Sequence, residues 1–400
     1  MKKHVKSNVY WVGQNDWELR RFPGYEYSTY RGTRYNSFII QEEKTVLIDT
    51  VITNFSSDFV KNLAKEIDLS SIDYIICTQA EEDHSGALPE LMSLIPDTPI
   101  YCTENGRDVL KGNYQQNWNF ITIKGEERLS IGNGKELVLV DFPLSTYPDT
   151  MFCYMSIDNI LFSNVLFGQH FSSELLFNDL VVQSDLSFES IKYYANLLSP
   201  LSDVVTKKIN DCIKKNISLD MICPNHGILW RNNNLQIVTN YLMWANNYHE
   251  NQVTIIYDTM YKGTRAIAQS IAEGIYSADS SVNIKLLNAS ICNKNDIITE
   301  IFRSKGVLVG SPCMNRCILP SISLILDITK GLKFKNKKAA AFGSCGLKDL
   351  SIGIVDKKLK EAGFDIVMDP ISFKCSLTDE ALEASKNYGW LFWDILSRND

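Results

Sequence analysis

Apolar residues in the first 250 positions form short runs that are separated by polar turns. Five of these runs have the length and the flanking residues of β-strands, namely Tyr35–Ile40, Thr45–Asp49, Tyr74–Thr78, Asn159–Ser163 and Met221–Pro224. The third run ends at a dense polar cluster. Loops that follow buried strands often carry function, because the strand fixes the end of a loop that stays open to solvent. Side chains with chemical roles are therefore expected just after these strand ends.

After Asn251 the pattern changes to a regular alternation of strands and helices. The predicted strands are Val253–Tyr257, Val282–Leu287, Gly306–Gly310, Ala339–Ser344 and Asp365–Met368, and the last predicted helix is Asp379–Leu396. Five such β-α units are typical of a doubly wound, five-stranded parallel sheet. The chain of 400 residues is long enough for two domains. We place the boundary in a polar stretch, with one domain at residues 1–250 and the other at 251–400.

Composition and charge restrict the class of protein. With 45% hydrophobic and 22% charged residues the chain is typical of a globular protein. No apolar run approaches the roughly 20 residues of a membrane helix, and Met1–Asn8 lacks the apolar segment of a secretory signal. Ten cysteines without any CxxC pair indicate reduced thiols, and hence a cytoplasmic location rather than a disulfide or zinc framework.

The net charge of −7 is unevenly distributed along the chain. Residues 252–400 have 19 basic and 16 acidic side chains, a balance of +3, which leaves −10 for residues 1–251. The acidic first part argues against nucleic acid as a partner. The second part suits a ligand with a phosphate group, although its lysine cluster at Lys333, Lys335, Lys337 and Lys338 could equally be a solvated surface, which is the commoner state of a charge run.

The first strand of the second domain leads directly into a loop with several hydroxyl groups, Asp258–Thr264, and then into a helix. Such a loop offers backbone N–H groups, hydroxyls and the positive end of the helix dipole to a phosphate. It matches neither GxGxxG nor GxxxxGK[ST], so it does not support a dinucleotide or nucleoside triphosphate site. Taken alone, Thr259 and Thr264 could simply be helix caps.

Two further loops, Ser311–Asn315 and Ser344–Leu347, follow the third and fourth strands, at the edge where open α/β sheets bind ligands. This domain resembles flavodoxin, which implies that it binds FMN. The implied FMN residues are Thr259, Met260, Tyr261, Lys262, Gly263, Thr264, Ser311, Pro312, Cys313, Met314, Asn315, Ser344, Cys345, Gly346 and Leu347. Related proteins commonly have an aromatic residue near Leu347, and leucine offers only dispersion contact with the ring.

The densest group of potential metal ligands is Thr78–Gly86, which contains Glu81, Asp83 and His84. By composition alone this could be a solvated loop. Its arrangement, however, resembles the H-x-E-x-D-H motif of the metallo-β-lactamase fold in its flavodiiron version. Further strings of that family occur at Asp16-Trp17, Tyr30–Thr33, Leu47–Val51, Tyr147–Met151, Phe167–His170 and Cys223–Gly227. The resemblance covers the whole chain and implies an αββα sandwich followed by a flavodoxin-like domain.

Family members of this type reduce O2 to water or NO to N2O at a diiron centre that receives electrons from FMN. Carried over position by position, the iron ligands that match are Glu81, Asp83, His84 and His226. The positions that do not match are Gln79 and Thr146, where the family has histidines, and Val165, where it has the bridging aspartate. A histidine near the site in the family is Pro23 here.

The losses fall on one side of the implied centre. Asp83, His84 and His226 would all bind the second iron, and two histidines with one carboxylate can hold a mononuclear Fe(II), Zn(II) or Mn(II). The alternative is an empty pocket in which the three residues are only hydrogen-bonded. Either way, we predict that four-electron reduction of O2 or coupling of two NO molecules is impaired, and no catalytic residue is assigned.

Functions other than an FMN-based oxidoreductase agree less well with these residues. A metallo-β-lactamase-type hydrolase usually has a second histidine where this chain has Glu81, which argues against hydrolysis. A thiol redox pair among Cys313, Cys317 and Cys345 is less common than free buried cysteines. The main alternative is a non-catalytic FMN sensor or binding protein.

The resemblance also implies partners. It implies a head-to-tail homodimer, because FMN of one subunit would serve the metal of the other. No rubredoxin-like CxxC pair occurs near the end of the sequence, so we expect a separate electron donor such as a rubredoxin or a flavin reductase. Neither nucleic acid nor a membrane is expected as a partner.

Overall fold

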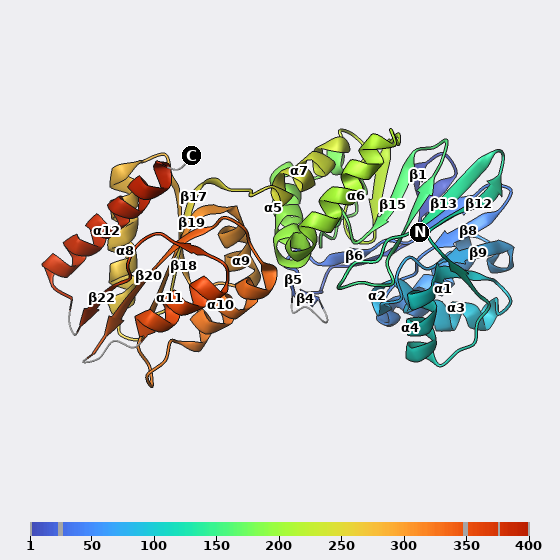
Figure 1. The fold of residues 1–400 in the computed structure, drawn as a ribbon. Helices are drawn as coiled ribbons and strands as arrows, with labels where there is room; N and C mark the ends of the chain where they lie inside the picture. Colours follow the sequence, from blue (N-terminus) through green and yellow to red (C-terminus); the bar gives the residue numbers. More distant parts are fainter. Residues whose placement is uncertain (1, 23–26, 347–350, 375–376, 399–400) are drawn as a thin grey trace. The chain divides into compact units, whose positions relative to one another are not determined.

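The computed structural model describes residues 2–22, 27–346, 351–374 and 377–398. By internal contacts the chain divides into two compact units, shown in Figure 1. The first consists of residues Met1–Tyr193 and Val204–Leu242, and the second of Tyr194–Asp203 and Met243–Asp400. The placement of the domain boundary between residues 250 and 251 stays a prediction.

The first unit is built on two β-sheets. The seven-stranded sheet has the order β1 (Lys3–Lys6), β2 (Val9–Trp11), β7 (Phe38–Gln41), β8 (Thr45–Ile48), β9 (Ile72–Ile76), β10 (Ile100–Thr103) and β11 (Phe120–Ile123). The five-stranded sheet has the order β12 (Glu126–Gly132), β13 (Lys135–Asp141), β14 (Met151–Met155), β15 (Ile160–Asn164) and β16 (Met221–Pro224). Two small hairpins pair β3 (Gln14–Asp16) with β6 (Thr33–Tyr35), and β4 (Arg21–Phe22) with β5 (Tyr27–Ser28).

Helices cover the outer faces of these sheets. The helices that lie wholly in this unit are α1 (Ser56–Glu66), α2 (Glu82–Ser85), α3 (Leu88–Leu94), α4 (Glu104–Tyr114) and α5 (Gln183–Tyr193). Most of α6 (Ser202–Lys214) and α7 (Leu235–Ala245) also belongs to it, while residues 202–203 and 243–245 group with the second unit. One apolar cluster joins residues of both sheets, such as Trp11, Phe38 and Phe162, while a second joins the seven-stranded sheet to α1, α3 and α4. Because alternate strand residues point to opposite faces, each sheet can contribute to two layers of core. The predicted αββα metallo-β-lactamase-like sandwich is confirmed.

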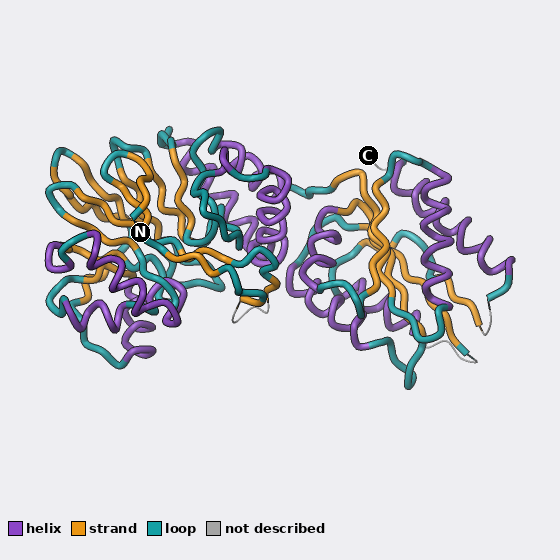
Figure 2. The backbone as a smooth tube through the Cα atoms, turned by 180° about the vertical axis from the view of Figure 1, so that it is seen from behind, coloured by secondary structure: helices purple, strands orange, loops and turns teal. Residues whose placement is uncertain are grey.

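The second unit is a doubly wound parallel sheet with helices on both faces, as seen from behind in Figure 2. Its strand order is β18 (Asn283–Asn288), β17 (Glu250–Tyr257), β19 (Ser304–Pro312), β20 (Lys338–Cys345) and β21 (Asp365–Ile366). The predicted fifth strand, Asp365–Met368, is shorter than expected, and β22 (Ile371–Lys374) pairs with the later part of β20. Pro370, which has no N–H to donate, lies between the two short strands.

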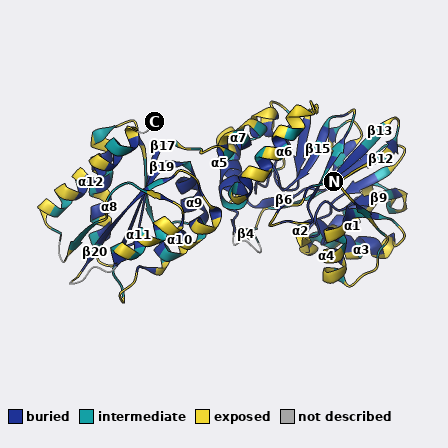
Figure 3. Cartoon of the chain, in the orientation of Figure 1, coloured by how far each residue is buried: buried dark blue, intermediate teal, exposed yellow. Residues whose placement is uncertain are grey.

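The helices of the second unit are α8 (Gly263–Ala278), α9 (Lys294–Arg303), α10 (Pro320–Leu332), α11 (Ser351–Glu361) and α12 (Asp379–Ser397). Helices α8 and α12 pack together on one face, and their contact depends on glycine. A Cβ at Gly274 would lie 1.8 Å from the carbonyl oxygen of Lys386, and one at Gly389 would lie 2.1 Å from that of Ile271. Figure 3 shows that in each unit the central strands are buried, whereas edge strands such as β12 and β18 are more open and exposed positions gather on the outer sides of the helices.

Candidate metal centre and phosphate loop

Three predicted metal ligands meet in the first unit. Asp83 and His84 lie on α2, shortly after β9, and His226 follows β16. One potential ligand atom from each of the three lies within 4.8 Å of those of the other two. Both histidines are buried, and the Asp83 side chain is 9% exposed. The fold therefore brings together two segments that are more than 140 positions apart in the sequence.

The His226 ring is aimed by a backbone acceptor. Its Nδ1 lies 2.9 Å from the carbonyl oxygen of Arg34, which can only accept, so Nδ1 carries the proton. Its Nε2 then faces Oδ2 of Asp83 at 2.8 Å. The Arg34 backbone is held in turn by its buried guanidinium, which donates to Asn15 Oδ1 and to the carbonyl of Leu175, each over 2.9 Å.

The His84 ring is aimed in the same way, but by a side chain. Its Nδ1 donates to Oδ2 of Asp49 over 3.1 Å, and Asp49 is fixed by the backbone N–H and the hydroxyl of Thr78. The other nitrogen, Nε2, lies 3.6 Å from Asp83 and 2.8 Å from the amide nitrogen of Asn225. Metal-ligating histidines typically donate the second ring N–H to a carboxylate or a carbonyl in this manner. The two rings and Asp83 thus suit one metal ion.

The charges of this group are strongly coupled. Burial by itself would raise the pKa of Asp83, but His84 and His226 outweigh it and hold the pKa well below its ordinary value. Burial by itself would lower the pKa of His84, but Asp83 and Asp49 raise it to about 9. The neighbouring carboxylates therefore favour a positive charge at His84, and a metal ion would take the place of the proton there.

The other side of the site has weaker potential metal donors at Gln79, Val165 and Thr146. Gln79 is buried, and neither its amide nitrogen nor its amide oxygen has a hydrogen-bond partner among the described residues. Val165 is buried and apolar, while Thr146 is exposed in the tight turn formed by Leu144 and Tyr147. Glu81 is exposed as the residue that precedes α2, and desolvation together with the charge of Asp83 raises its pKa to about 7. No bridging carboxylate is present at Val165 to join two ions.

Sequence reasoning missed the residues that orient the ligands. Asp49 and Asn225 lie inside two of the sequence strings on which the family resemblance rests. The sequence alone did not show that both contact the His84 ring. Arg34 acts through its backbone oxygen, for which a sequence gives no signal. His170 lies with its ring centre 5.0 Å from that of His226. Burial and the neighbouring His226 lower the pKa of His170 well below its ordinary value, so it is neutral.

In the second unit, the predicted phosphate loop leads into the N-terminus of α8. Lys262 has a left-handed backbone with φ 66°, and the helix begins at Gly263. The Thr264 hydroxyl lies 2.8 Å from that of Ser344, so this hydrogen bond joins the first turn of α8 to the end of β20. The hydroxyl of Thr259 is buried without a partner among the described residues. An orphaned hydroxyl beside the free N–H groups of a helix N-terminus fits a phosphate.

The remaining predicted FMN residues differ in their exposure to solvent. Met260, Tyr261, Lys262 and Asn315 are exposed, whereas Ser311 is buried and its hydroxyl is used by Pro312 and Leu319. Leu347, like Pro23 in the first unit, lies outside the described residues. The structure therefore supplies no description of the ring contact predicted at Leu347.

The cysteines of this region do not form an obvious pair. Met314 and Cys317 are paired across a tight turn, with positive φ at Asn315 and Arg316. Successive residues of such a ladder point to opposite faces, so Cys313 and Cys317 lie on opposite sides of it. This geometry does not favour a disulfide between them.

Comparison with known proteins gives the same division of the chain. The ODP family beta lactamase profile matches residues 33–227, and the flavodoxin profile matches residues 255–388. The anaerobic nitric oxide reductase flavorubredoxin of Vibrio vulnificus is 50% identical over 366 residues, which are 91% of this chain and 74% of that protein. The protein of the same name from Pectobacterium atrosepticum is 47% identical over 390 residues, 97% of this chain and 76% of that protein.

Solved structures agree over the whole length. The rubredoxin oxygen:oxidoreductase of Desulfovibrio gigas has a TM-score of 0.94 at 29% identity, covering 100% of this chain and 99% of that chain. The flavodiiron protein of Giardia intestinalis also has a TM-score of 0.94, at 27% identity, with 100% and 97% covered. Among the described residues, no helix combines the length and the apolar character that crossing a membrane requires.

Proposed function

This chain belongs to the flavodiiron protein family, and from that premise we propose that it is an FMN-dependent electron-transfer protein with at most one metal ion, held by Asp83, His84 and His226. The observation that carries the proposal is the contrast around the site. Three ligands that are aimed at one point lie beside Gln79 and Val165, which offer no strong donor for a second ion.

The residues of the chain have separable roles in this proposal. When bound, FMN supplies electrons and a divalent metal supplies open coordination positions for a small substrate. Asp83 would offset part of the charge of the ion, and Asp49 and the Arg34 carbonyl would keep both imidazoles in the tautomer that presents Nε2. Glu81, the residue before α2, would add a further carboxylate. No residue on the Gln79 side replaces the lost ligands.

FMN would be held by the loops at the carboxyl ends of the strands. The Thr259 hydroxyl and the first N–H groups of α8 would receive the phosphate. The segments Ser311–Asn315 and Ser344–Gly346 would flank the ring system, and Leu347 remains a predicted contact.

The partners and the location belong to the same proposal. A head-to-tail homodimer would bring FMN of one subunit to the metal of the other. A separate donor, such as a rubredoxin or a flavin reductase, would supply electrons to the more basic residues 252–400. The thiol-rich composition supports a cytoplasmic location.

The test is a metal and flavin analysis of protein purified without oxygen. We expect one FMN and no more than one metal ion per chain, together with slow use of O2 that releases peroxide. Two irons per chain, with O2 reduced to water, would overturn the proposal. A bound flavin that rubredoxin and flavin reductase both fail to reduce would instead favour the sensor.

A further inference from the structure

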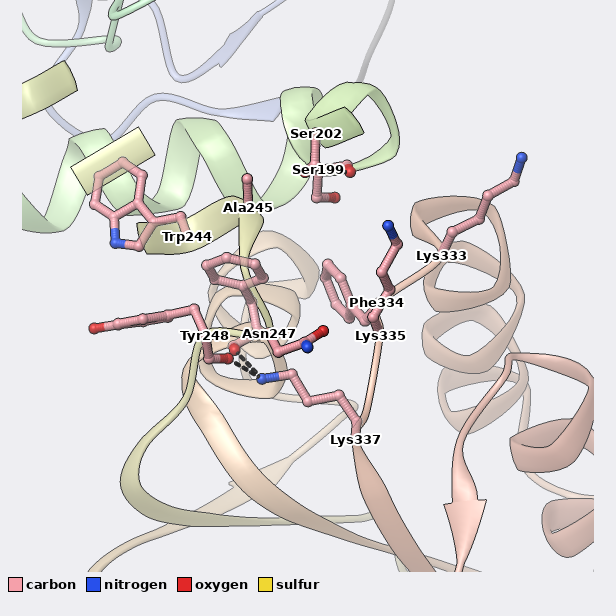
Figure 4. Close-up of a pocket in the computed structure, with 11 residues that line it drawn as sticks. Ser199, Ser202, Trp244, Ala245, Asn247, Tyr248, Lys333, Phe334, Lys335 and Lys337 are labelled. Carbon is pink, nitrogen blue, oxygen red and sulfur yellow. Dashed lines mark hydrogen bonds between the residues drawn. The ribbon is translucent and has the colours of Figure 1, made fainter. Parts of the chain in front are cut away.

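The two edges of the parallel sheet in the second unit carry different chemistry. At the edge where the strands begin, the buried amino group of Lys337 is already occupied, because it donates to the backbone carbonyls of Tyr248 and Phe302 (Figure 4). At the opposite edge, β19 and β20 end next to each other, and a cysteine lies at each end. Cys313 directly follows β19, and Cys345 is the last residue of β20. In this structure both are thiols.

The ladder between the two strands sets these thiols side by side. Pro312 pairs with Ser344 at the last register position, and the Cys313 N–H donates to the Ser344 carbonyl over 3.3 Å. Cys313 and Cys345 are therefore the next residues along the two strands. Because adjacent strands lie about 4.8 Å apart, we expect their Cα atoms to lie within the roughly 4.4–6.8 Å at which disulfides form. Cys345, and not Cys317, is the neighbour of Cys313 across the sheet.

Both thiols belong on the same face of the sheet. The Ser344 hydroxyl contacts the first turn of α8, so Ser344 faces that helix. A Cβ at Gly343 would lie 3.8 Å from the hydroxyl oxygen of Ser351, so Gly343 faces α11. Side chains alternate along a strand, and paired residues of parallel strands point the same way. This alternation places Cys313 and Cys345 together on the α11 face.

The two thiols differ in their access to solvent. Cys313 is partly exposed, whereas Cys345 is buried, with a relative exposure of 8%. An accessible thiol next to a second thiol that resolves it is a common arrangement in redox-sensitive proteins. Cys313 is therefore the thiol that an oxidant in solution reaches first, and Cys345 is the one that can complete a disulfide.

We propose that Cys313 and Cys345 are a redox-active thiol pair, which hydrogen peroxide converts into a disulfide and a dithiol reductant restores. Peroxide oxidises the Cys313 thiol to a sulfenic acid and is itself reduced to water. The Cys345 sulfur then attacks the sulfenic sulfur, so that an S–S bond forms, the S–O bond breaks and a second water molecule leaves. The two thiols thus give two electrons to one peroxide. A flavin that releases peroxide would supply the oxidant, and only this supply rests on the proposed function.

The first test adds hydrogen peroxide to the reduced full-length protein, purified with its flavin, in the absence of an electron donor. The remaining thiols are then alkylated and the protein is digested with trypsin. Cys313, Cys317, Cys345 and Cys375 fall in separate tryptic peptides, namely 306–316, 317–330, 339–348 and 375–386. We expect a cross-linked peptide that contains Cys313 and Cys345, lighter by about 2 Da than its two parts together, which dithiothreitol separates again.

The result of this test does not depend on flavin turnover, because peroxide is added directly and no donor is present. Absence of the cross-linked peptide would overturn the proposal. So would a disulfide that joins Cys313 or Cys345 to Cys317 or Cys375 instead.

The second test separates the roles of the two thiols with variants. In Cys345→Ser the sulfenic acid at Cys313 has no thiol to resolve it, so its labelling by dimedone should rise severalfold above that in the unsubstituted protein. Cys317→Ser is the matched control, because it removes a nearby exposed thiol and should leave both the cross-link and the low labelling unchanged. Equal labelling of Cys313 in Cys345→Ser and in the unsubstituted protein would refute the assignment of Cys345 as the resolving thiol.

Discussion

On one side of the candidate metal centre, each imidazole has a second hydrogen bond that sets its direction, to Asp49 for His84 and to the Arg34 carbonyl for His226. On the other side, the Gln79 amide has no partner among the described residues and Val165 offers only carbon. The difference shows that the retained half kept its supporting hydrogen bonds together with its ligands. A preorganised half-site can bind one ion without the other half.

The largest effect is expected from returning a carboxylate to the lost half. Val165→Asp should lower the free energy of unfolding of the metal-free protein by about 3–5 kcal/mol, because it buries a charge without a partner. Chemical denaturation measures this loss, and the neutral Val165→Asn is the control. We expect the metal content to stay at one ion, since Gln79 and Thr146 would still be weak ligands. Two ions per chain in Val165→Asp would contradict our view of the lost half.

The next largest effect is expected from removing a ligand of the retained half. His226→Ala should weaken divalent metal binding by at least about 100-fold, more than the loss of a supporting residue typically does. Competition with a chromophoric chelator measures the affinity. His4→Ala is the matched control, because His4 is exposed and its ring bonds the Ser7 carbonyl three residues away. Equal metal affinity in the two variants would mean that His226 is not a ligand.

A smaller effect is expected from changing only the orientation of a ligand. Asp49→Asn should weaken metal binding by about 10–100-fold, because an amide supports the His84 tautomer less firmly than a carboxylate. The same chelator assay applies, with Asp68→Asn as a control, since Asp68 caps a short helix elsewhere. Unchanged affinity would show that Asp49 has only a structural role.

The smallest effect is expected at Gln79. Gln79→Leu should leave the metal content unchanged and alter the free energy of unfolding by no more than about 1 kcal/mol, because it removes a buried amide that has no partner. Gln169→Leu is the contrasting variant. The Gln169 amide is buried and hydrogen-bonds both the N–H and the carbonyl of Ile228, so its loss should cost about 1–3 kcal/mol. Loss of bound metal in Gln79→Leu would show that the lost half still takes part.

Much of the fold could be predicted from the sequence, because periodic apolar runs determine strands and helices locally. The sequence did not predict that the fifth strand would be divided into β21 and β22. That division depends on which part of β20 each short strand pairs with. Residues Tyr194–Asp203 group with the second unit. That grouping depends on contacts between aromatic rings that are far apart in the sequence, such as those of Tyr194 and Phe302.

For the candidate site too, the sequence identified residues but not the contacts between them. The motif placed Asp83, His84 and His226 as ligands, and the structure brings them together, while their binding of metal stays a prediction. The sequence identified Thr146 as a substitution for a ligand, but not that this residue is exposed. Nor did the sequence show that the buried Gln79 amide has no hydrogen-bond partner among the described residues, because no sequence pattern reports such an absence.

The acceptor for His226 is a main-chain oxygen, while the acceptor for His84 is a side chain. A single codon change can abolish the Asp49 carboxylate, but no exchange of one side chain for another removes the Arg34 carbonyl. Genetic drift can therefore disable the two imidazoles at unequal rates. Of the two rings, His84 is therefore the one whose alignment a single substitution can remove.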